Sequence, residues 1–92
     1  MKILNWSEEK NTILKNERDM SFEEILIAIN EGGLLDILEH PNKKKYPNQK
    51  IFVIEVNCYV YLVPFAENNN EIFLKTIIPS RKATKQYLIN NQ

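Results

Sequence analysis

The sequence is poor in the residues that build disulfides and metal sites. It holds one cysteine, Cys58, so no disulfide can form within the chain, and one histidine, His40. Without a Cys/His cluster we expect no metal ion to be bound. Cys58 lies within an apolar run, which predicts a buried thiol that behaves as a small hydrophobic side chain. A reactive thiol is the alternative.

Long hydrophobic runs are missing as well. No apolar stretch approaches the roughly 20 residues that a membrane-spanning helix needs, and nothing resembles a signal peptide. Glycine is limited to Gly32 and Gly33, which favours a compact chain over one rich in linkers. With 92 residues, we expect a single domain, residues 1–92, in the cytoplasm.

The chain also lacks a net charge, because 12 Lys and Arg residues balance 12 Asp and Glu residues. The two signs are unevenly distributed along it. Residues 1–40 hold four cations and nine carboxylates, whereas residues 41–92 hold eight cations and three carboxylates. This asymmetry is compatible with a basic face and an acidic face. The neutral total argues, weakly, against tight non-specific binding to nucleic acid.

Caps and apolar spacing predict three helices. Ser7, followed by two glutamates in the first turn, opens a surface helix over residues 7–18. Ser21 and Glu24 form a capping box, and the helix behind it has a core-facing stripe of Phe22, Ile25, Leu26 and Ile29. A third helix is expected over residues 80–88, directly after a proline.

The remaining segments predict strands. Residues 2–6 are extended in character, and residues 34–40 are ambiguous between a short strand and a helical turn. A three-strand meander is expected in the second half, with a tight turn near Asn57, over residues 50–56, 58–65 and 71–78. The sequence therefore predicts an α+β fold with an antiparallel sheet, two N-terminal helices and one C-terminal helix.

The two ends of the chain carry motifs that resemble a known family. The first is "NWSEEKNTILKNERDMSFEEI", and the second, far along the chain, is "IFLKTIIPSRKATKQYL". In order, spacing and length they resemble the BrnT family of bacterial toxins, which belongs to the RelE-like group of small ribonuclease toxins. The matching positions are Trp6, Glu9, Lys10, Asn11, Arg18, Ser21, Phe22, Glu23, Glu24, Arg81, Lys82, Ala83 and Thr84.

The resemblance implies a RelE-like fold and the toxin component of a type II toxin–antitoxin pair. Such proteins cut RNA and arrest growth until a cognate antitoxin binds them. The antitoxin of this family is typically a ribbon-helix-helix DNA-binding protein, so DNA would be contacted only through it. The expected activity is that of a metal-independent endoribonuclease without a cofactor.

Three positions depart from the family pattern. Arg18 stands where many members have a histidine, Thr76 stands where many have an arginine, and Pro79-Ser80 replaces Ser-Ala. One alternative is therefore a non-enzymatic protein of toxin fold that acts mainly by binding its antitoxin. Another is a stand-alone RNA-binding domain.

Metal-independent RNA cleavage needs a base for the ribose 2′-OH, a cation for the phosphate and an acid for the leaving oxygen. Arg81 is the first candidate for a phosphate clamp, with Lys82 beside it, because a guanidinium grips two phosphate oxygens. Two cations at a helix start oppose the macrodipole, which hints at a function. Lys10 and Arg18 would join them if the first helix lay beside the last.

A second candidate region is the lysine-rich loop after residue 40. It is expected to contact RNA backbone and stack a base through Lys43, Lys44, Lys45 and Tyr46. The alternative is an ordinary solvated loop. His40 precedes a proline at the edge of this loop, where a structural role is the simpler interpretation. Tyr61 and Tyr87 are further candidates for a proton donor.

Overall fold

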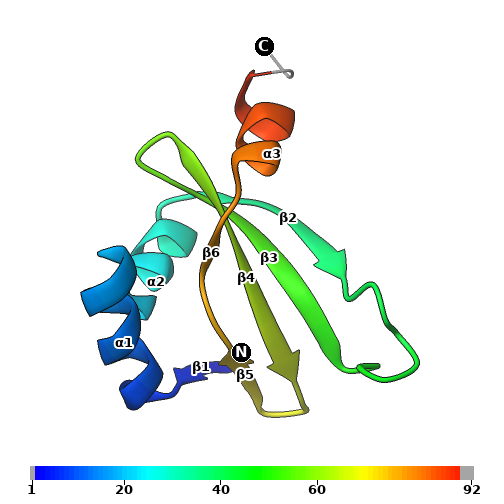
Figure 1. The fold of residues 1–92 in the computed structure, drawn as a ribbon. Coiled ribbons are helices and arrows are strands. Elements are labelled where there is room, and N and C mark those ends of the chain that lie inside the picture. Colours follow the sequence, from blue (N-terminus) through cyan, green and yellow to red (C-terminus); the bar gives the residue numbers. More distant parts are fainter. Residues whose placement is uncertain (1, 90–92) are drawn as a thin grey trace.

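The computed structural model describes residues 2–89, which form an α+β domain (Figure 1). This confirms the fold class predicted from the sequence. No helix within this range is long and apolar enough to cross a membrane. In chain order the elements are β1 (Ile3–Trp6), α1 (Glu8–Arg18), α2 (Phe22–Asn30), β2 (Leu34–Glu39), β3 (Gln49–Val56), β4 (Tyr59–Glu67), β5 (Glu71–Leu74), β6 (Ile78–Pro79), α3 (Arg81–Thr84) and a π-helical turn, η1 (Lys85–Ile89).

All six strands form one sheet with the order β1-β5-β4-β3-β2, and β6 pairs with β4. The expected meander is present as β3, β4 and β5, which pair antiparallel, but its third strand ends at Leu74 and not at residue 78. The ambiguous segment is a strand, β2, paired antiparallel with β3 at the edge of the sheet. The N-terminal strand also exists, but β1 runs parallel to β5. The sheet is therefore mixed, whereas the sequence predicted only antiparallel pairing.

The turn between β3 and β4 lies where the sequence placed it. Val56 pairs with Tyr59, so the turn consists of two residues, Asn57 and Cys58, with φ angles of 52° and 65°. Two successive positive φ values define the primed turn that suits the twist of a hairpin. Cys58 is exposed at this turn. The expectation of a buried thiol is wrong, because the apolar run is interrupted by the turn itself.

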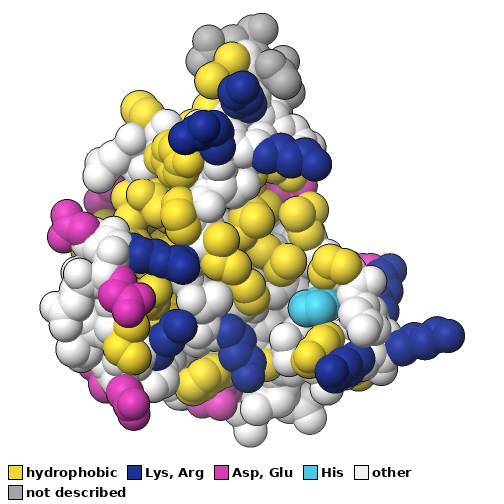
Figure 2. Space-filling view, viewed as in Figure 1, with side chains coloured by type: hydrophobic (Ala, Val, Ile, Leu, Met, Phe, Trp, Pro, Cys, Tyr) yellow, Lys and Arg dark blue, Asp and Glu magenta, His cyan; other side chains and the backbone are white. Residues whose placement is uncertain are grey.

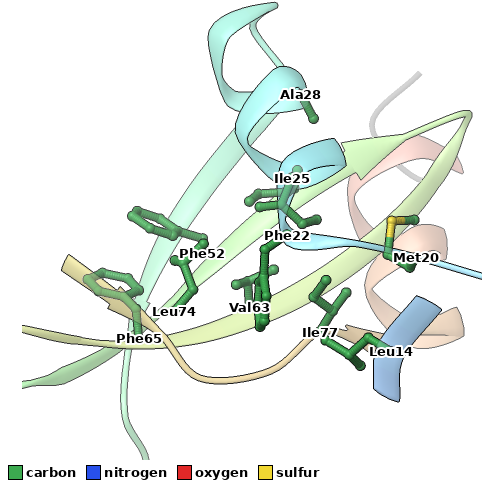
Figure 3. Packing of buried hydrophobic residues seen from close by; sticks show 11 residues of the cluster. Leu14, Met20, Phe22, Ile25, Ala28, Phe52, Val63, Phe65, Leu74 and Ile77 are labelled. Atoms are coloured by element: carbon green, nitrogen blue, oxygen red, sulfur yellow. The ribbon is translucent and has the colours of Figure 1, made fainter. Parts of the chain in front are cut away.

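The helices α1 and α2 begin at the predicted caps. The hydroxyl oxygen of Ser7 accepts a hydrogen bond from the Lys10 N–H, and that of Ser21 accepts one from the Glu24 N–H. Most of α1 is exposed, but Leu14 is buried with the apolar stripe of α2. Figure 3 shows how these side chains meet the strands in one cluster that includes Phe22, Ile25, Phe52, Val63, Phe65, Leu74 and Ile77.

The end of α2 depends on its two glycines. Gly32 has a φ of +89°, a conformation that side-chain-bearing residues rarely adopt. At Gly33 a Cβ atom would lie 2.7 Å from the carbonyl oxygen of Glu55 and 2.9 Å from that of Ala28. Its N–H donates to Ala28, and its own carbonyl oxygen accepts from the Glu55 N–H. The close approach of α2 to β3 therefore requires a residue without a side chain.

The other face of the sheet carries a second, smaller core. Because side chains alternate along a strand, the strand residues opposite the first cluster point to this face. Val53 and Val60 are buried there against Ala83 of α3, with Leu35, Leu62, Tyr87 and Leu88 packed around them. The helices therefore pack on opposite faces: α1 and α2 on one, and the short α3 with η1 on the other. Figure 1 shows α1 and α3 well apart.

Candidate functional site

Two hydrogen bonds hold the corner that leads into α3 against β4, and two more close the first turn of α3. The N–H of Ser80 donates to the Val60 carbonyl oxygen over 3.0 Å, and the hydroxyl of Ser80 accepts from the Ala83 N–H over 3.1 Å. Thr84 donates through its hydroxyl to the Ser80 carbonyl oxygen, and the same hydroxyl accepts from the Val60 N–H. The first turn of α3 is therefore fixed in position by its own Ser and Thr side chains.

This anchoring leaves the cations of the corner in solvent, and we call the group Arg81, Lys82 and Lys85 the cation corner. Ala83 is the buried residue of α3, whereas Arg81, Lys82 and Lys85 are exposed. Within residues 2–89 the ion pairs are Lys2 with Glu67, Lys15 with Glu23, and Lys43 with Glu39. The three cations of the corner thus have no carboxylate partner in the described part of the chain. No carboxylate therefore competes with an anion at these side chains, and phosphate binding by Arg81 and Lys82 stays a prediction.

Lys10 and Arg18, the two candidates on α1, have different surroundings. Arg18, at the end of that helix, donates from Nη1 to the carbonyl oxygen of Ile77 over 2.5 Å. Lys10 lies half-buried in the first turn, and its backbone N–H is used by the cap. Because α1 and α3 pack on opposite faces, the helix-to-helix packing that would gather all four cations is not found. Arg18 instead touches the segment that runs through β6 into the corner.

Beyond α3, the second face of the sheet is open and apolar. Strand register arranges its side chains in rows that cross the strands. One row joins Ile78 to Leu62, a second joins Leu38 to Ile51 and Pro64, and a third joins Phe73 to Ala66 and Gln49. Ile78 and Leu38 are 41% and 39% exposed, and the others are half-buried except where α3 covers them. We call this surface the open face.

Cations surround the open face. Figure 2 shows hydrophobic side chains in the middle of the view, with Lys and Arg side chains over α3, near α1 and around the loop that joins β2 to β3. On β5 the alternation that buries Leu74 turns Phe73 and Lys75 to the open face. The Lys75 ammonium lies 5.6 Å from the centre of the Phe73 ring. An apolar floor with a basic rim is a surface suited to a flexible polyanion with flat apolar groups.

The lysine-rich loop between β2 and β3 is ordered by its own contacts. The Asn42 N–H donates to Nδ1 of His40, and the Asn42 side-chain oxygen accepts from the Lys45 N–H. The rings of His40 and Tyr46 lie 4.5 Å apart, and the Lys45 ammonium lies 5.4 Å from the Tyr46 ring centre. Of the predicted RNA-binding lysines, Lys43 pairs with Glu39, whereas Lys44 and Lys45 have no carboxylate partner within residues 2–89.

The tyrosines considered as proton donors have other surroundings. Tyr87 donates its hydroxyl to Oδ2 of Asp36 over 2.8 Å, and this hydrogen bond, with burial and the negative charge of Asp36, raises the Tyr87 pKa. Its proton is therefore held between η1 and β2. Burial raises the pKa of Tyr61, which packs against the first core, with smaller effects from Tyr59 and Glu24. Tyr61 thus lies on the face away from the corner.

A hollow of about 390 Å³ lies on a different part of the surface, between α2 and the end of β3. Glu24, Glu31 and Glu55 line it together with Ile27, which is 54% exposed, and no Lys or Arg side chain lines it. Its acidic lining is unsuited to phosphate. The uneven charge seen in the sequence therefore corresponds to separate surfaces, an acidic one beside α2 and a basic one around the open face.

Three residues at the site were not singled out from the sequence. Lys85 extends the cation corner by one turn, and Phe73 on β5 forms an aromatic–cation pair with Lys75, the residue just after that strand's end. Phe73 and Lys75 could have been found from the sequence, because side-chain alternation along "EIFLK" turns them to the face opposite Leu74. Nothing local indicated that the open face would remain uncovered.

No group of three or more His, Cys, Asp or Glu side chains in residues 2–89 is arranged to hold a metal ion. Comparison of the chain with models of protein families, with curated proteins and with solved structures finds no match.

Proposed function

We propose that this chain is the toxin component of a type II toxin–antitoxin pair and that it cleaves RNA without a metal ion. The observation that carries the proposal is the group of exposed cations without carboxylate partners, Arg81, Lys82 and Lys85, beside an open apolar sheet face. The resemblance of both chain ends to BrnT-family toxins supports it, together with the α+β fold. The proposal implies that the protein acts in the bacterial cytoplasm.

In this proposal the Arg81 guanidinium holds the phosphate at the cleavage point. It is exposed, always charged, and fixed at its backbone by the hydrogen bonds of Ser80 and Thr84. The ribose 2′-OH gives its proton to a base, and its oxygen attacks the adjacent phosphorus to form a 2′,3′-cyclic phosphate. The bond to the 5′-oxygen breaks, and that oxygen leaves with a proton from an acid. Lys82 adds positive charge that stabilises the phosphorane-like transition state. Lys10 and Arg18 remain candidates for shaping the site from the side of α1.

A second candidate function is supported by one contact and one departure from the family motif. The Arg18 guanidinium is already engaged by the Ile77 carbonyl oxygen, and Thr76 offers no charge where relatives of this family carry an arginine. Both facts favour a toxin-fold protein without enzyme activity, whose main act is to bind a cognate antitoxin, expected to be a ribbon-helix-helix protein. Any contact with DNA would then be made by that partner.

Induction in bacteria separates the two functions. The wild type should arrest growth and deplete RNA, and an Arg81→Ala/Lys82→Ala double variant should do neither. A Lys2→Ala/Lys15→Ala double variant is the matched control, since it removes the same charge from two side chains that pair with Glu67 and Glu23. Normal growth with a soluble, folded wild type would exclude the ribonuclease. A stable complex with the product of a neighbouring small reading frame would then support the binding protein.

A further inference from the structure

Two aromatic groups lie at the two ends of one row of the open face. Phe73 on β5 pairs with Ala66 on β4, which pairs with Gln49 on β3, and the His40 N–H donates to the Gln49 carbonyl oxygen. The His40 ring lies 4.5 Å from the Tyr46 ring and is tilted by 42° relative to it. Three strand spacings separate Phe73 from His40, a distance of about 14 Å across the sheet. The row therefore carries an aromatic group at each end and small or polar side chains between them.

Each aromatic group has a cation over it. Lys75 lies 5.6 Å from the Phe73 ring centre, and Lys45 lies 5.4 Å from the Tyr46 ring centre. Neither lysine has a carboxylate partner in the part of the chain that the structure describes. Phe73 belongs to neither buried core and stays half-exposed. The core therefore does not account for a large aromatic ring at this position.

We propose that a single-stranded RNA crosses the open face and stacks its bases at two positions. One position is Phe73 with Lys75, and the other is Tyr46 with His40 and Lys45. The inference rests on the proposed function and adds the path of the RNA to it. Stacking on an aromatic ring suits every base, and a cation beside the ring meets the adjoining phosphate. A duplex is disfavoured because its bases are already stacked on each other.

The path also connects the two regions that the sequence selected separately. The cation corner is attached to β4 at Val60, and the row with Phe73 meets the same strand at Ala66. Six residues of strand separate these points by about 20 Å. An RNA held at both stacking positions could continue along β4 toward Arg81, across the row of Pro64 and then the row of Ile78. The lysine-rich loop would then position the RNA strand on which Arg81 and Lys82 act.

The test measures binding without cleavage. The probe is a fluorescein-labelled single-stranded RNA of about 12 nucleotides, within the usual site sizes, in which every 2′-OH is methylated so that it cannot attack the phosphate. Fluorescence anisotropy should show that Phe73→Leu and Tyr46→Leu each weaken binding about ten-fold. Their salt dependence should match that of the wild type, because no charge is lost. Lys75→Ala should instead reduce the salt dependence.

Tyr59→Leu is the matched control, because Tyr59 is a half-buried tyrosine whose ring packs beside Tyr61 at the other end of β4. It should bind the probe as the wild type does. Thermal unfolding reports whether each variant is folded. If Phe73→Leu does not fold, Phe73→Trp takes its place and should bind at least as tightly as the wild type, while the loop variant and Lys75→Ala still test the proposal.

Three results would overturn the stacking positions. The first is that both leucine variants bind the probe as tightly as the wild type does, and the second is that the wild type does not bind the probe. The third is that a duplex RNA binds as tightly as the single strand and loses the same affinity in the variants. The failure of the proposed function looks different. If the leucine variants weaken binding as expected but the wild type causes neither growth arrest nor RNA loss, the ribonuclease activity is excluded and the proposed RNA path stands.

Discussion

Arg18 at the end of α1 donates a hydrogen bond from Nη1 to the carbonyl oxygen of Ile77, which lies 59 residues further along the chain. Ile77 is fully buried, and the next two residues form β6 and lead into the cation corner. A single guanidinium therefore ties the first helix to the segment that positions Arg81. The same side chain was selected from the sequence as a catalytic candidate, so its two possible roles need to be separated.

Arg18→Ala should lower the free energy of unfolding by about 1–2 kcal/mol, because a charged donor to a backbone carbonyl is lost at a partly exposed place. Urea unfolding measures this. Arg81→Ala is the matched control and should change stability by less than about 0.5 kcal/mol, since its side chain is exposed. An Arg18→Ala variant of unchanged stability that no longer arrests growth would contradict the structural role and favour a catalytic one.

Asn11 should contribute more to stability than any other polar residue of α1. It is 1% exposed, its side-chain oxygen accepts from the Phe22 N–H over 2.8 Å, and its amide donates to Glu23 over 2.7 Å. Asn11→Ala leaves a buried N–H without an acceptor and should cost about 2 kcal/mol. Asn16→Ala, at an exposed position of the same helix, is the control. Equal unfolding midpoints for the two variants would show that water replaces the lost acceptor.

The Glu23 carboxylate should make stability depend on acid pH. Its pKa lies below the ordinary 4.5, first because the Asn11 amide donates to it, and also through its own backbone N–H and the charge of Lys15. Since the folded-state pKa is the lower one, the stabilising contribution is present above the unfolded value and is lost as the pH falls through the folded value. Wild type and Glu23→Gln should therefore differ in urea midpoint near neutral pH and converge as the pH falls below the folded-state pKa of Glu23. A constant difference would mean that the charge of Glu23 is not responsible.

The elements that the sequence predicted well are those with local signals. The caps predicted at Ser7 and Ser21 are present, and each accepts from an N–H three residues further along. Ser80 caps α3 in the same way, although the sequence analysis did not name it as a cap. The turn at Asn57 was likewise indicated by neighbouring residues. These signals need no knowledge of the remaining chain, because a cap or a two-residue turn is completed within four residues.

Features that depend on distant segments were not predicted. The parallel pairing of β1 with β5 joins Ile3 to Glu71, and only the completed sheet brings them together. Arg81 and Lys82 were selected from a local motif, and their exposure follows from the local helix, which buries Ala83. The engagement of Arg18 was not predicted, because its partner is a backbone carbonyl, which every residue carries. Phe73 was missed because an aromatic residue in a strand is usually part of a core.

The turn at Cys58 offers a stabilising substitution. Its φ of 65° brings the Cβ atom close to the following carbonyl oxygen, at a cost of about 1 kcal/mol for residues other than glycine. Asn57 is already the preferred first residue of such a turn, and glycine is the preferred second. Cys58→Gly should therefore raise the free energy of unfolding by about 1 kcal/mol.

Cys58→Ser is the matched control for this change, because it removes the exposed thiol and keeps the Cβ atom. Its unfolding midpoint should stay within about 0.5 kcal/mol of the wild type. If both variants gained stability equally, the strain would lie in the thiol and not in the backbone. A loss of stability in Cys58→Gly alone would show that the added freedom of glycine in the unfolded chain outweighs the relief of the turn.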